Sequence, residues 1–277
     1  MFDRRPDCSI IIVSYQHRQY LSGCLRSLIN GEKKLNLEII VIDNNSSDGA
    51  IDSLNPDIFN EITLVKNNRN LGFAKACNQG IRMAKSNIVM FVNPDVLTVS
   101  GSIQKMLRFL ELNPAASCVV PVLKNIDGSI QYSCRKFPGW KETLLKRTPL
   151  RWFVDPEEVN RYSRRTVDLI NRKIPFQINW ALGGCLMVKR STFDTIGGLD
   201  EKFFLYCEDI DWFYRLEKAG LKAYCLPEAI MYHKHLAVSD HKLPSVESFY
   251  HSVGILRFVF KHAGDILTGR YPPKNLI

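Results

Sequence analysis

The sequence lacks the features that would place it in a membrane or secreted class. The longest apolar runs, such as residues 10–13 and 118–123, have the length of strands and fall far short of the ~18–20 residues that a spanning helix needs. Residues 1–7 contain neither the apolar core nor the cleavage site of a signal peptide. We therefore expect a cytoplasmic protein that is not an integral membrane protein.

Several well-known cofactor and redox motifs are also missing. The eight cysteines are never closer than 16 residues apart and form no CxxC pair, so we expect them to be reduced and mostly buried. No GxGxxG follows the first strand-like run, and no GxxxxGK[ST] occurs anywhere. A phosphate group bound by this chain must therefore be held by side chains rather than by a glycine-rich loop.

What the chain does contain is typical of a globular protein. Its 277 residues are 45% hydrophobic and 23% charged, which excludes disordered and collagen-like chains. The 37 Lys and Arg residues outnumber the 28 Asp and Glu residues by 9, and 6 of that excess lie in residues 135–173. Such a basic segment can bind nucleic acid, an anionic membrane surface or an anionic substrate, and charge alone does not choose among them.

The first hundred residues alternate strand-like runs with helical patterns. Strands are expected at residues 9–13, 38–42, 62–65 and 88–92, and a helix begins near Gly72. This alternation predicts an α/β fold with a doubly wound, mostly parallel central sheet and helices on both faces. Ligands bind such sheets beyond the carboxyl ends of the strands.

Polar residues follow three of these strands, so they should converge at one edge of the sheet. The first pair is Ser14 and Tyr15. Asp43 can accept hydrogen bonds from a ribose or a base, although the sequence around it is equally typical of a turn. Asp95, on the rigid turn that begins at Asn93, is well placed to bind a divalent cation, and a plain Asn-Pro-Asp turn explains it as well.

The densest acidic cluster begins a predicted helix and is preceded by aromatic residues. Glu208, Asp209 and Asp211 lie at the positive end of that helix, and Glu208 and Asp211 share a face. Helix capping accounts for one or two acids there, whereas three acids against an aromatic wall favour a general base with neighbours. His233 and His235 follow a short strand and are either structural or metal and phosphate ligands.

Together these segments resemble family 2 glycosyltransferases of the GT-A fold, with the nearest resemblance to bacterial rhamnosyltransferase-like members that build O-antigen, capsule or cell-wall glycans. The resemblance covers roughly residues 8–240. The motifs occur in the family's order and are SIIIVSY (9–15), EIIVIDNNSSD (38–48), NNRNLGFAKACNQGI (67–81), VNPDV (92–96), WALGGCLMVKR (180–190) and IGGLDEKFFLYCEDIDWFYR (196–215).

The resemblance implies an inverting single displacement, in which an acceptor hydroxyl attacks the anomeric carbon of a nucleotide sugar. Asp209 matches the catalytic base, and Asp95 and His233 match residues that hold Mg²⁺ or Mn²⁺. The implied nucleotide-sugar site comprises Ser14, Tyr15, Asp43, Asn70, Gly72, Phe73, Asn78, Asn93 and Asp95. The implied acceptor site comprises Trp180, Gly184, Glu208 and Asp211.

The chain departs from the family pattern at the metal motif. Asn93 stands at the first position of the DxD-type motif, so only one carboxylate would anchor the metal. Gln16 stands where the family often has Asn, and either His233 or His235 can be the histidine that matches. A nucleotide-sugar-binding protein without turnover therefore stays an alternative.

The resemblance divides the chain into a GT-A domain at residues 1–240 and a tail at 241–277. Residues 1–100 would bind the nucleotide sugar, and residues 101–240 would bind the acceptor and carry the base. The tail predicts an amphipathic helix that either packs on the domain or lies on a membrane surface. With about 1 kcal/mol for each Lys or Arg near an anionic leaflet, residues 135–173 could hold the enzyme at the cytoplasmic face of the inner membrane.

The expected reaction moves L-rhamnose from dTDP-L-rhamnose to a glycan or lipid-linked oligosaccharide acceptor. Transfer of another sugar from a UDP or GDP donor is the alternative within the same family. A nucleic-acid partner is not expected, because the chain has no recognisable motif for reading nucleic acid.

Overall fold

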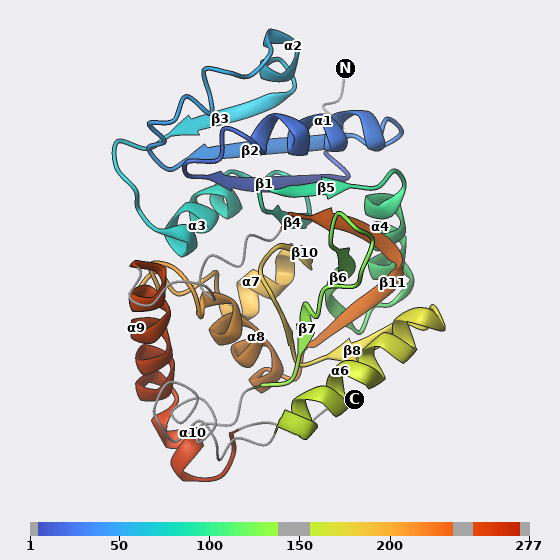
Figure 1. Ribbon diagram of the computed structural model, residues 1–277, viewed down its shortest axis with the longest axis vertical. Coiled ribbons are helices and arrows are strands. Elements are labelled where there is room, and N and C mark those ends of the chain that lie inside the picture. Colours follow the sequence, from blue (N-terminus) through green and yellow to red (C-terminus); the bar gives the residue numbers. More distant parts are fainter. Residues whose placement is uncertain (1–4, 138–155, 235–245, 272–277) are drawn as a thin grey trace.

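The computed structural model describes residues 5–137, 156–234 and 246–271, and a nine-stranded sheet forms its centre (Figure 1). The strands lie in the order β3 (Ile62–Lys66), β2 (Leu37–Asp43), β1 (Cys8–Ser14), β4 (Ile88–Val92), β10 (Cys185–Lys189), β6 (Ala116–Lys124), β11 (Lys222–His233) and β5 (Val96–Thr98), and β8 (Phe176–Ile178) pairs with β11. Six of these nine strands run in the same direction. The mixed α/β architecture with a mostly parallel sheet is therefore confirmed.

Helices cover both faces of the sheet, because its central strands are apolar on both sides. In β1, Ile10 and Ile12 belong to one buried cluster and Ile11 and Val13 to the other, as the alternation of side chains along a strand requires. The first cluster includes residues of α1 (Leu21–Gly31) and α4 (Ser102–Leu112). The second includes residues of α3 (Phe73–Met83), α7 (Arg190–Ile196) and α8 (Glu208–Lys218).

The remaining elements surround this core. A short helix, α2 (Pro56–Phe59), precedes β3, and a two-stranded sheet pairs β7 (Cys134–Arg135) with β9 (Trp180–Ala181). Helix α6 (Pro156–Asn171) lies within the basic segment, of which residues 138–155 are outside the described part. All eight cysteines are free and buried, as expected.

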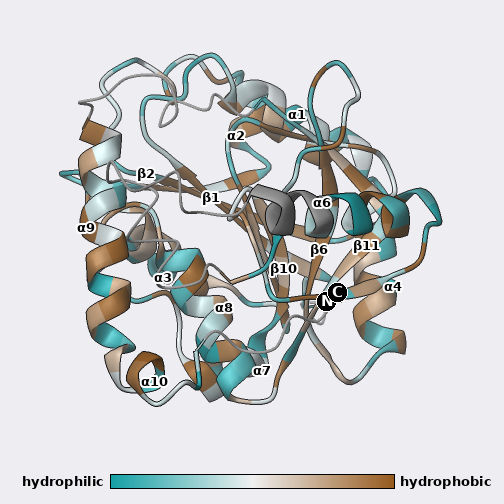
Figure 2. Cartoon of the chain, turned by 60° about the horizontal axis from the view of Figure 1, so that its bottom comes forward, coloured by the Kyte–Doolittle hydropathy of each residue, from teal (hydrophilic) through white to brown (hydrophobic). Residues whose placement is uncertain are grey.

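The tail forms two helices, α9 (Val246–Lys261) and α10 (Ala263–Leu267). One face of α9 packs on α8, where the ring centroids of Phe258 and Tyr214 lie 5.9 Å apart. The opposite face exposes Val246, Phe249, Leu256 and Phe260, and Figure 2 shows apolar residues along the helix. Within the described residues, no helix is both long enough and apolar enough to cross a membrane.

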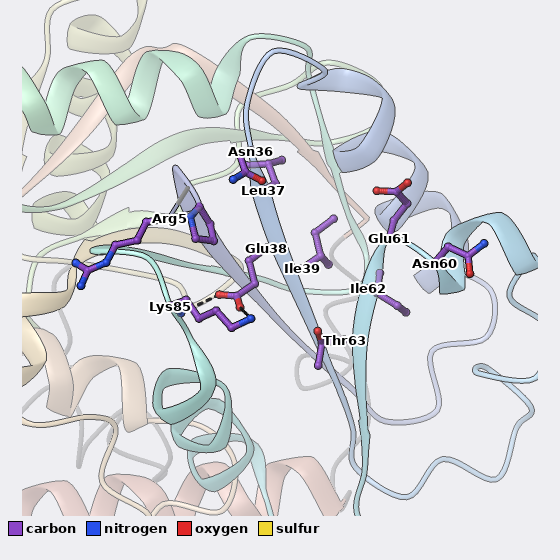
Figure 3. A pocket seen from close by; sticks show the side chains of 11 residues that line it. Arg5, Asn36, Leu37, Glu38, Ile39, Asn60, Glu61, Ile62, Thr63 and Lys85 are labelled. Atoms are coloured by element: carbon purple, nitrogen blue, oxygen red, sulfur yellow. Dashed lines mark hydrogen bonds and ion pairs between the residues drawn. The ribbon is translucent and has the colours of Figure 1, made fainter. Parts of the chain in front are cut away.

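A hollow of about 300 Å³ lies at the amino ends of β2 and β3, away from the edge where ligands are expected (Figure 3). The carboxylate of Glu38 lines it, 3.7 Å from the ammonium group of Lys85, and accepts hydrogen bonds from the Ser9 hydroxyl and the Lys85 backbone N–H. These contacts join the starts of β1, β2 and β4. We interpret this hollow as a structural feature of the sheet.

Candidate active site

The carboxyl ends of β1 and β2 place the first predicted donor residues side by side. Ser14 and Asp43 end their strands as register partners, and both are buried. Asp43 accepts a hydrogen bond from the Ser46 N–H at 3.2 Å, whereas the Ser14 hydroxyl has no partner among the described residues. Tyr15, which follows directly, is 43% exposed. The edge therefore carries buried polar atoms with remaining hydrogen-bonding capacity beside an accessible ring.

An asparagine network supports this edge, and its central member was not predicted. Asn44 is buried, its amide nitrogen donates to the side-chain oxygen of Asn70 at 2.8 Å, and its amide oxygen accepts from Asn67 and from the Leu71 N–H. Asn70 in turn accepts from the Gly72 N–H at 2.9 Å. Asn70 therefore shapes the turn before α3, and Asn44 escaped prediction because it stands in a run rich in turn residues.

Helix α3 contacts the loop at residues 199–206, which precedes the acidic cluster in the sequence. Gly72 has a φ of 85°, and a Cβ at this position would lie 2.7 Å from the Phe204 carbonyl oxygen. That oxygen accepts a hydrogen bond from the Phe73 N–H at 2.8 Å. The Asn78 amide donates to the Leu199 carbonyl and accepts from the Leu199 N–H. Gly72 and Asn78 thus hold α3 against the 199–206 loop, and their role at the donor stays a prediction.

The next cluster joins Asp95 and His233, which come from the ends of two neighbouring strands. The Nε2 atom of His233 lies 3.3 Å from the Oδ1 atom of Asp95, and both side chains are largely buried. Burial raises the pKa of Asp95, but the hydrogen bond and charge of His233 outweigh it and hold the pKa below its usual value. His235 lies outside the described residues.

The surroundings of this pair fit a divalent cation. Gly184 packs on the imidazole, since a Cβ there would lie 3.3 Å from the Cε1 atom and 3.5 Å from the Nε2 atom of His233. The Gly184 carbonyl oxygen accepts from the Asn93 N–H at 2.9 Å, which anchors the Asn93 turn beside the pair. One carboxylate, one imidazole and one amide side chain are all suitable metal ligands. Across the described chain, however, no three His, Cys, Asp or Glu side chains gather into one metal-binding group.

His17 is a further polar group near Asp95 that the sequence did not single out. Its Nδ1 atom accepts a hydrogen bond from the Tyr15 N–H at 3.0 Å. Burial lowers the pKa of His17, although the charges of Asp95 and Asp48 raise it. A neutral imidazole held in this way presents its Nε2–H as a donor. A histidine in a polar turn gave no signal in the sequence.

The acidic pair Glu208 and Asp209 lies in an apolar setting at the start of α8. Phe73, Phe91, Leu186, Leu199, Trp212 and Phe213 line a small cavity together with these two acids and Gly183. The Oε2 atom of Glu208 is buried and has no hydrogen-bond partner among the described residues. Asp209 is half-buried, and its Oδ1 atom accepts from the Ile210 N–H at 2.8 Å.

This environment acts differently on the pKa of Glu208 and on that of Asp209. Burial, together with the neighbouring charge of Asp209, raises the pKa of Glu208 to about 8. Burial also raises the pKa of Asp209, but the N–H groups of Ile210 and Gly183 and the charge of Arg135 act against it. With a pKa of about 8, Glu208 keeps its proton at neutral pH; the pKa of Asp209 is raised as well, but the two N–H groups and the Arg135 charge favour its carboxylate form.

Two adjacent glycines connect the acidic pair with the Asp95–His233 pair. A Cβ at Gly183 would lie 3.9 Å from the Oδ2 atom of Asp209, whereas Gly184 contacts His233. The base candidate and the metal-ligand candidate therefore flank the same short turn. Motifs that are 114 residues apart, from Asp95 to Asp209, thus meet at one site.

Trp180 lies at the edge of this site on β9. It is buried, its indole N–H donates to the Lys136 carbonyl at 2.7 Å, and the guanidinium of Arg135 lies 5.7 Å from its ring centroid. Arg135 is exposed, and its charge acts on Asp209. This edge of the site therefore combines an aromatic ring with a cation.

Asp211 corrects the sequence prediction. Its side chain has no exposed surface, and its carboxylate binds Arg215 at 2.9 Å, Lys261 at 2.8 Å and His262 at 2.8 Å. An acceptor cannot reach a carboxylate enclosed in this way. The helical spacing correctly placed Asp211 in the first turn of α8 but did not show that α9 packs over it.

Comparison with known proteins identifies the family. The profile described as "Glycosyl transferase family 2" matches residues 9–197, and "N-terminal domain of galactosyltransferase" matches residues 164–251. The N-acetylglucosaminyl-diphospho-decaprenol L-rhamnosyltransferase of Mycobacterium tuberculosis is 27% identical over 92% of this chain and 85% of its own. Rhamnosyltransferase WbbL of Escherichia coli K12 is 27% identical over 82% of this chain and 83% of its own.

Solved structures agree on the fold. The crystal structure of GalNAc-T7 with UDP, GalNAc and Mn²⁺ matches 98% of this chain with a TM-score of 0.62 at 17% identity. That of TarS from S. aureus matches 92% with a TM-score of 0.55 at 15% identity. This chain spans 59% and 43% of those two chains, respectively. The likeness shows the GT-A glycosyltransferase fold.

Proposed function

Since the chain belongs to glycosyl transferase family 2 and is a glycosyltransferase, we propose that it transfers L-rhamnose from dTDP-L-rhamnose, with inversion, to a hydroxyl of a lipid-diphosphate-linked bacterial glycan. Two relatives that align over most of the chain have names that describe rhamnosyltransferases. One of those names describes an acceptor with a diphosphate-linked lipid. The observation that carries the chemistry is the turn at Gly183 and Gly184, which joins Asp209 to the Asp95–His233 pair.

In this proposal the base is Asp209. An acceptor hydroxyl must lose its proton as it attacks the anomeric carbon, and a carboxylate within hydrogen-bond reach accepts that proton. Glu208, which keeps its own proton, leaves a single negative charge on the pair. The apolar cavity beneath them excludes water from that side. Arg135 would bind the diphosphate of the acceptor, and the buried Trp180 ring beneath its guanidinium would hold Arg135 in place on the acceptor side.

On the donor side, Ser14, Tyr15 and Asp43 would contact the nucleoside. The buried Ser14 hydroxyl and the Asp43 carboxylate supply hydrogen-bonding atoms, and the exposed Tyr15 ring supplies a stacking surface. Asp95, His233 and the Asn93 side chain would hold Mg²⁺ or Mn²⁺ beside the donor diphosphate. A bound divalent cation offsets the charge of a diphosphate leaving group.

The proposal also places the protein at an anionic membrane surface. The exposed apolar stripe of α9 would enter the interface, and Arg257, exposed on the same helix, would face anionic headgroups. The basic segment at 135–173 would add to this attraction, although residues 138–155 lie outside the described part. Contact with the membrane would bring the site close to a lipid-linked acceptor.

A direct transfer assay tests the function. The protein, with Mn²⁺, dTDP-L-rhamnose and a short-chain GlcNAc-diphospholipid, should yield a rhamnosylated lipid whose new glycosidic bond has the configuration opposite to that of the donor, as read by NMR. UDP- and GDP-sugars serve as matched donors. Transfer only from one of these would replace the donor assignment. Thermal stabilisation by nucleotide sugars without any transfer would favour a binding protein.

Vesicle co-sedimentation tests the membrane surface. A Phe249→Gln, Phe260→Gln variant should lose binding to vesicles of anionic lipid while keeping transfer to a water-soluble acceptor. Leu112→Gln is the matched control, because Leu112 is equally an exposed apolar residue but lies on α4. Equal loss in both variants, or no loss in either, would contradict the role of α9.

A further inference from the structure

Gln131 connects the imidazole of His233 to the loop between β6 and β7. Its Oε1 atom lies 2.9 Å from the Nδ1 atom of His233, and its Nε2 atom donates to the His233 carbonyl oxygen at 2.8 Å. The same Nε2 atom donates to the Oδ1 atom of Asn125 at 2.6 Å. One side-chain amide thus holds both the ring and the backbone of a single residue.

The network decides which end of the amide faces the ring. A backbone carbonyl oxygen accepts hydrogen bonds and cannot donate them, so the amide nitrogen must be the atom beside the His233 carbonyl. The amide oxygen is therefore the atom beside Nδ1 of His233. An oxygen of this kind can only accept, which means that Nδ1 carries a proton and donates it.

The consequence appears on the other side of the ring. Because Gln131 keeps Nδ1 protonated, Nε2 is the ring atom that can give up its proton to solvent and offer a lone pair to a cation in place of its hydrogen bond to Asp95. That Nε2 atom lies 3.3 Å from the Oδ1 atom of Asp95. A lone pair and a carboxylate oxygen directed at the same place form a set of donor atoms for a cation.

Hydrogen bonds within the loop between β6 and β7 stabilise the position of Gln131. The backbone N–H of Asn125 donates to the Ser129 carbonyl at 2.8 Å, and its side-chain nitrogen donates to the Ser129 hydroxyl at 2.8 Å. The Gln131 N–H donates to the Leu123 carbonyl at the end of β6. These bonds hold Gln131 in place from its own loop, independently of the contact with His233.

We propose that Gln131 is a positioning residue that keeps the proton of His233 on Nδ1 and presents Nε2 as a metal ligand. This inference rests on the metal role that the proposed function gives to Asp95 and His233. Partners that orient a ligating histidine typically change metal affinity by 10- to 100-fold when they are removed. Gln131→Met removes the acceptor at nearly the same size, whereas Gln131→Glu keeps an acceptor oxygen beside Nδ1 and, in its protonated form, an O–H donor for the His233 carbonyl.

The experiment titrates each protein with Mn²⁺ and measures free Mn²⁺ by EPR, while pulsed EPR detects a nitrogen atom bound to the metal. Gln131→Met should bind Mn²⁺ 10- to 100-fold more weakly with a weakened nitrogen signal, and Gln131→Glu should recover both. Asn125→Ala is the matched control, because it disturbs the same loop but leaves the acceptor of Nδ1, and it should behave as wild type.

The outcomes separate the two claims. If His233→Ala binds Mn²⁺ as tightly as wild type, the metal assignment itself fails. If binding depends on His233 but Gln131→Met retains the wild-type affinity and nitrogen signal, the role of Gln131 is overturned while the metal assignment stands. Equal weakening by Asn125→Ala and Gln131→Met, with no recovery in Gln131→Glu, would reduce Gln131 to a part of the loop.

Discussion

Two acids three residues apart on α8, Glu208 and Asp211, have opposite environments. Both lie in the first turn, where the helix dipole favours negative charge, and both are buried. Glu208 faces an apolar cavity, its Oε2 atom lacks a partner among the described residues, and its pKa is raised to about 8. Asp211 faces cationic groups. Burial raises its pKa, but bonds from His262 and Lys261 and the charge of Arg215 lower it to about 2.

The difference shows that the neighbours, and not the residue type or the helix position, decide what a carboxyl group does. The side on which Glu208 faces apolar residues holds the pair proposed for chemistry. The side on which Asp211 binds three partners joins α8 to the tail, because Lys261 and His262 lie at the end of α9 and just beyond it. One turn of helix thus separates the pair proposed for chemistry from a structural junction.

Breaking the structural side should have the largest effect on stability. Asp211→Asn leaves the cations of Arg215 and Lys261 and the ring of His262 facing a neutral amide, and removal of one partner from a buried ion pair costs about 3–5 kcal/mol of unfolding free energy. Denaturant unfolding measures the change. Because the pKa of Asp211 is lowered, its stabilisation is present above the ordinary value of 3.8 and is lost as the pH falls toward 2. If the denaturant midpoint of Asp211→Asn at pH 7 equals that of the wild type, the claim that Asp211 joins α8 to the tail is wrong.

Removal of one of the three partners should have a smaller effect. Lys261→Met takes away hydrogen bonds to Asp211 and to Asp200 but leaves Arg215 and His262 in place. Hydrogen bonds to charged groups contribute about 1.5–3 kcal/mol, and the partly exposed ammonium group places the loss near the lower value. Unfolding curves should therefore fall between those of wild type and Asp211→Asn. A loss as large as that of Asp211→Asn would show that Lys261 alone holds the junction.

The apolar surroundings of Glu208 should make the unfolding free energy depend on pH. With a raised pKa, folded Glu208 keeps a proton that the unfolded chain releases near pH 4.5, so its contribution is full below pH 4.5 and is lost as the pH rises to about 8. The slope is at most about 1.4 kcal/mol per pH unit. Glu208→Gln should remove this slope in unfolding measured from pH 5 to 8. Parallel curves for the two proteins would mean that Glu208 is ionised.

The smallest effect should come from a second contact between α8 and the tail. Lys218 pairs with Asp265 at 2.7 Å, but its side chain is 51% exposed. Exposed pairs contribute about 0–1 kcal/mol, so Lys218→Met should change the unfolding free energy by less than 1 kcal/mol. If Lys218→Met loses more unfolding free energy than this, the exposed Lys218–Asp265 pair, and not Asp211, would be the main contact between α8 and the tail.

The sequence predicts the framework better than the site. Apolar runs located the central strands to within a residue or two, because a strand covered on both faces must be apolar along its length. The ordered motifs assigned Asp95 and Asp209 to one active site, and their roles there stay a prediction. Gln131 and Asn44 were missed, since their importance depends on partners distant in the sequence, such as His233, 102 residues from Gln131. Asp211 was misplaced for the same reason: two of its partners, Lys261 and His262, lie about fifty residues later in the sequence.

The most direct test applies one substitution, acid to amide, to two adjacent residues and compares kcat for sugar transfer at pH 7. Glu208→Gln should stay within a few-fold of wild type, because an amide resembles the neutral acid. Asp209→Asn should lose about 10²- to 10⁴-fold, because the proton acceptor is gone. Equal losses in both variants, or an active Asp209→Asn, would contradict the assignment of one neutral acid and one base to the first turn of α8.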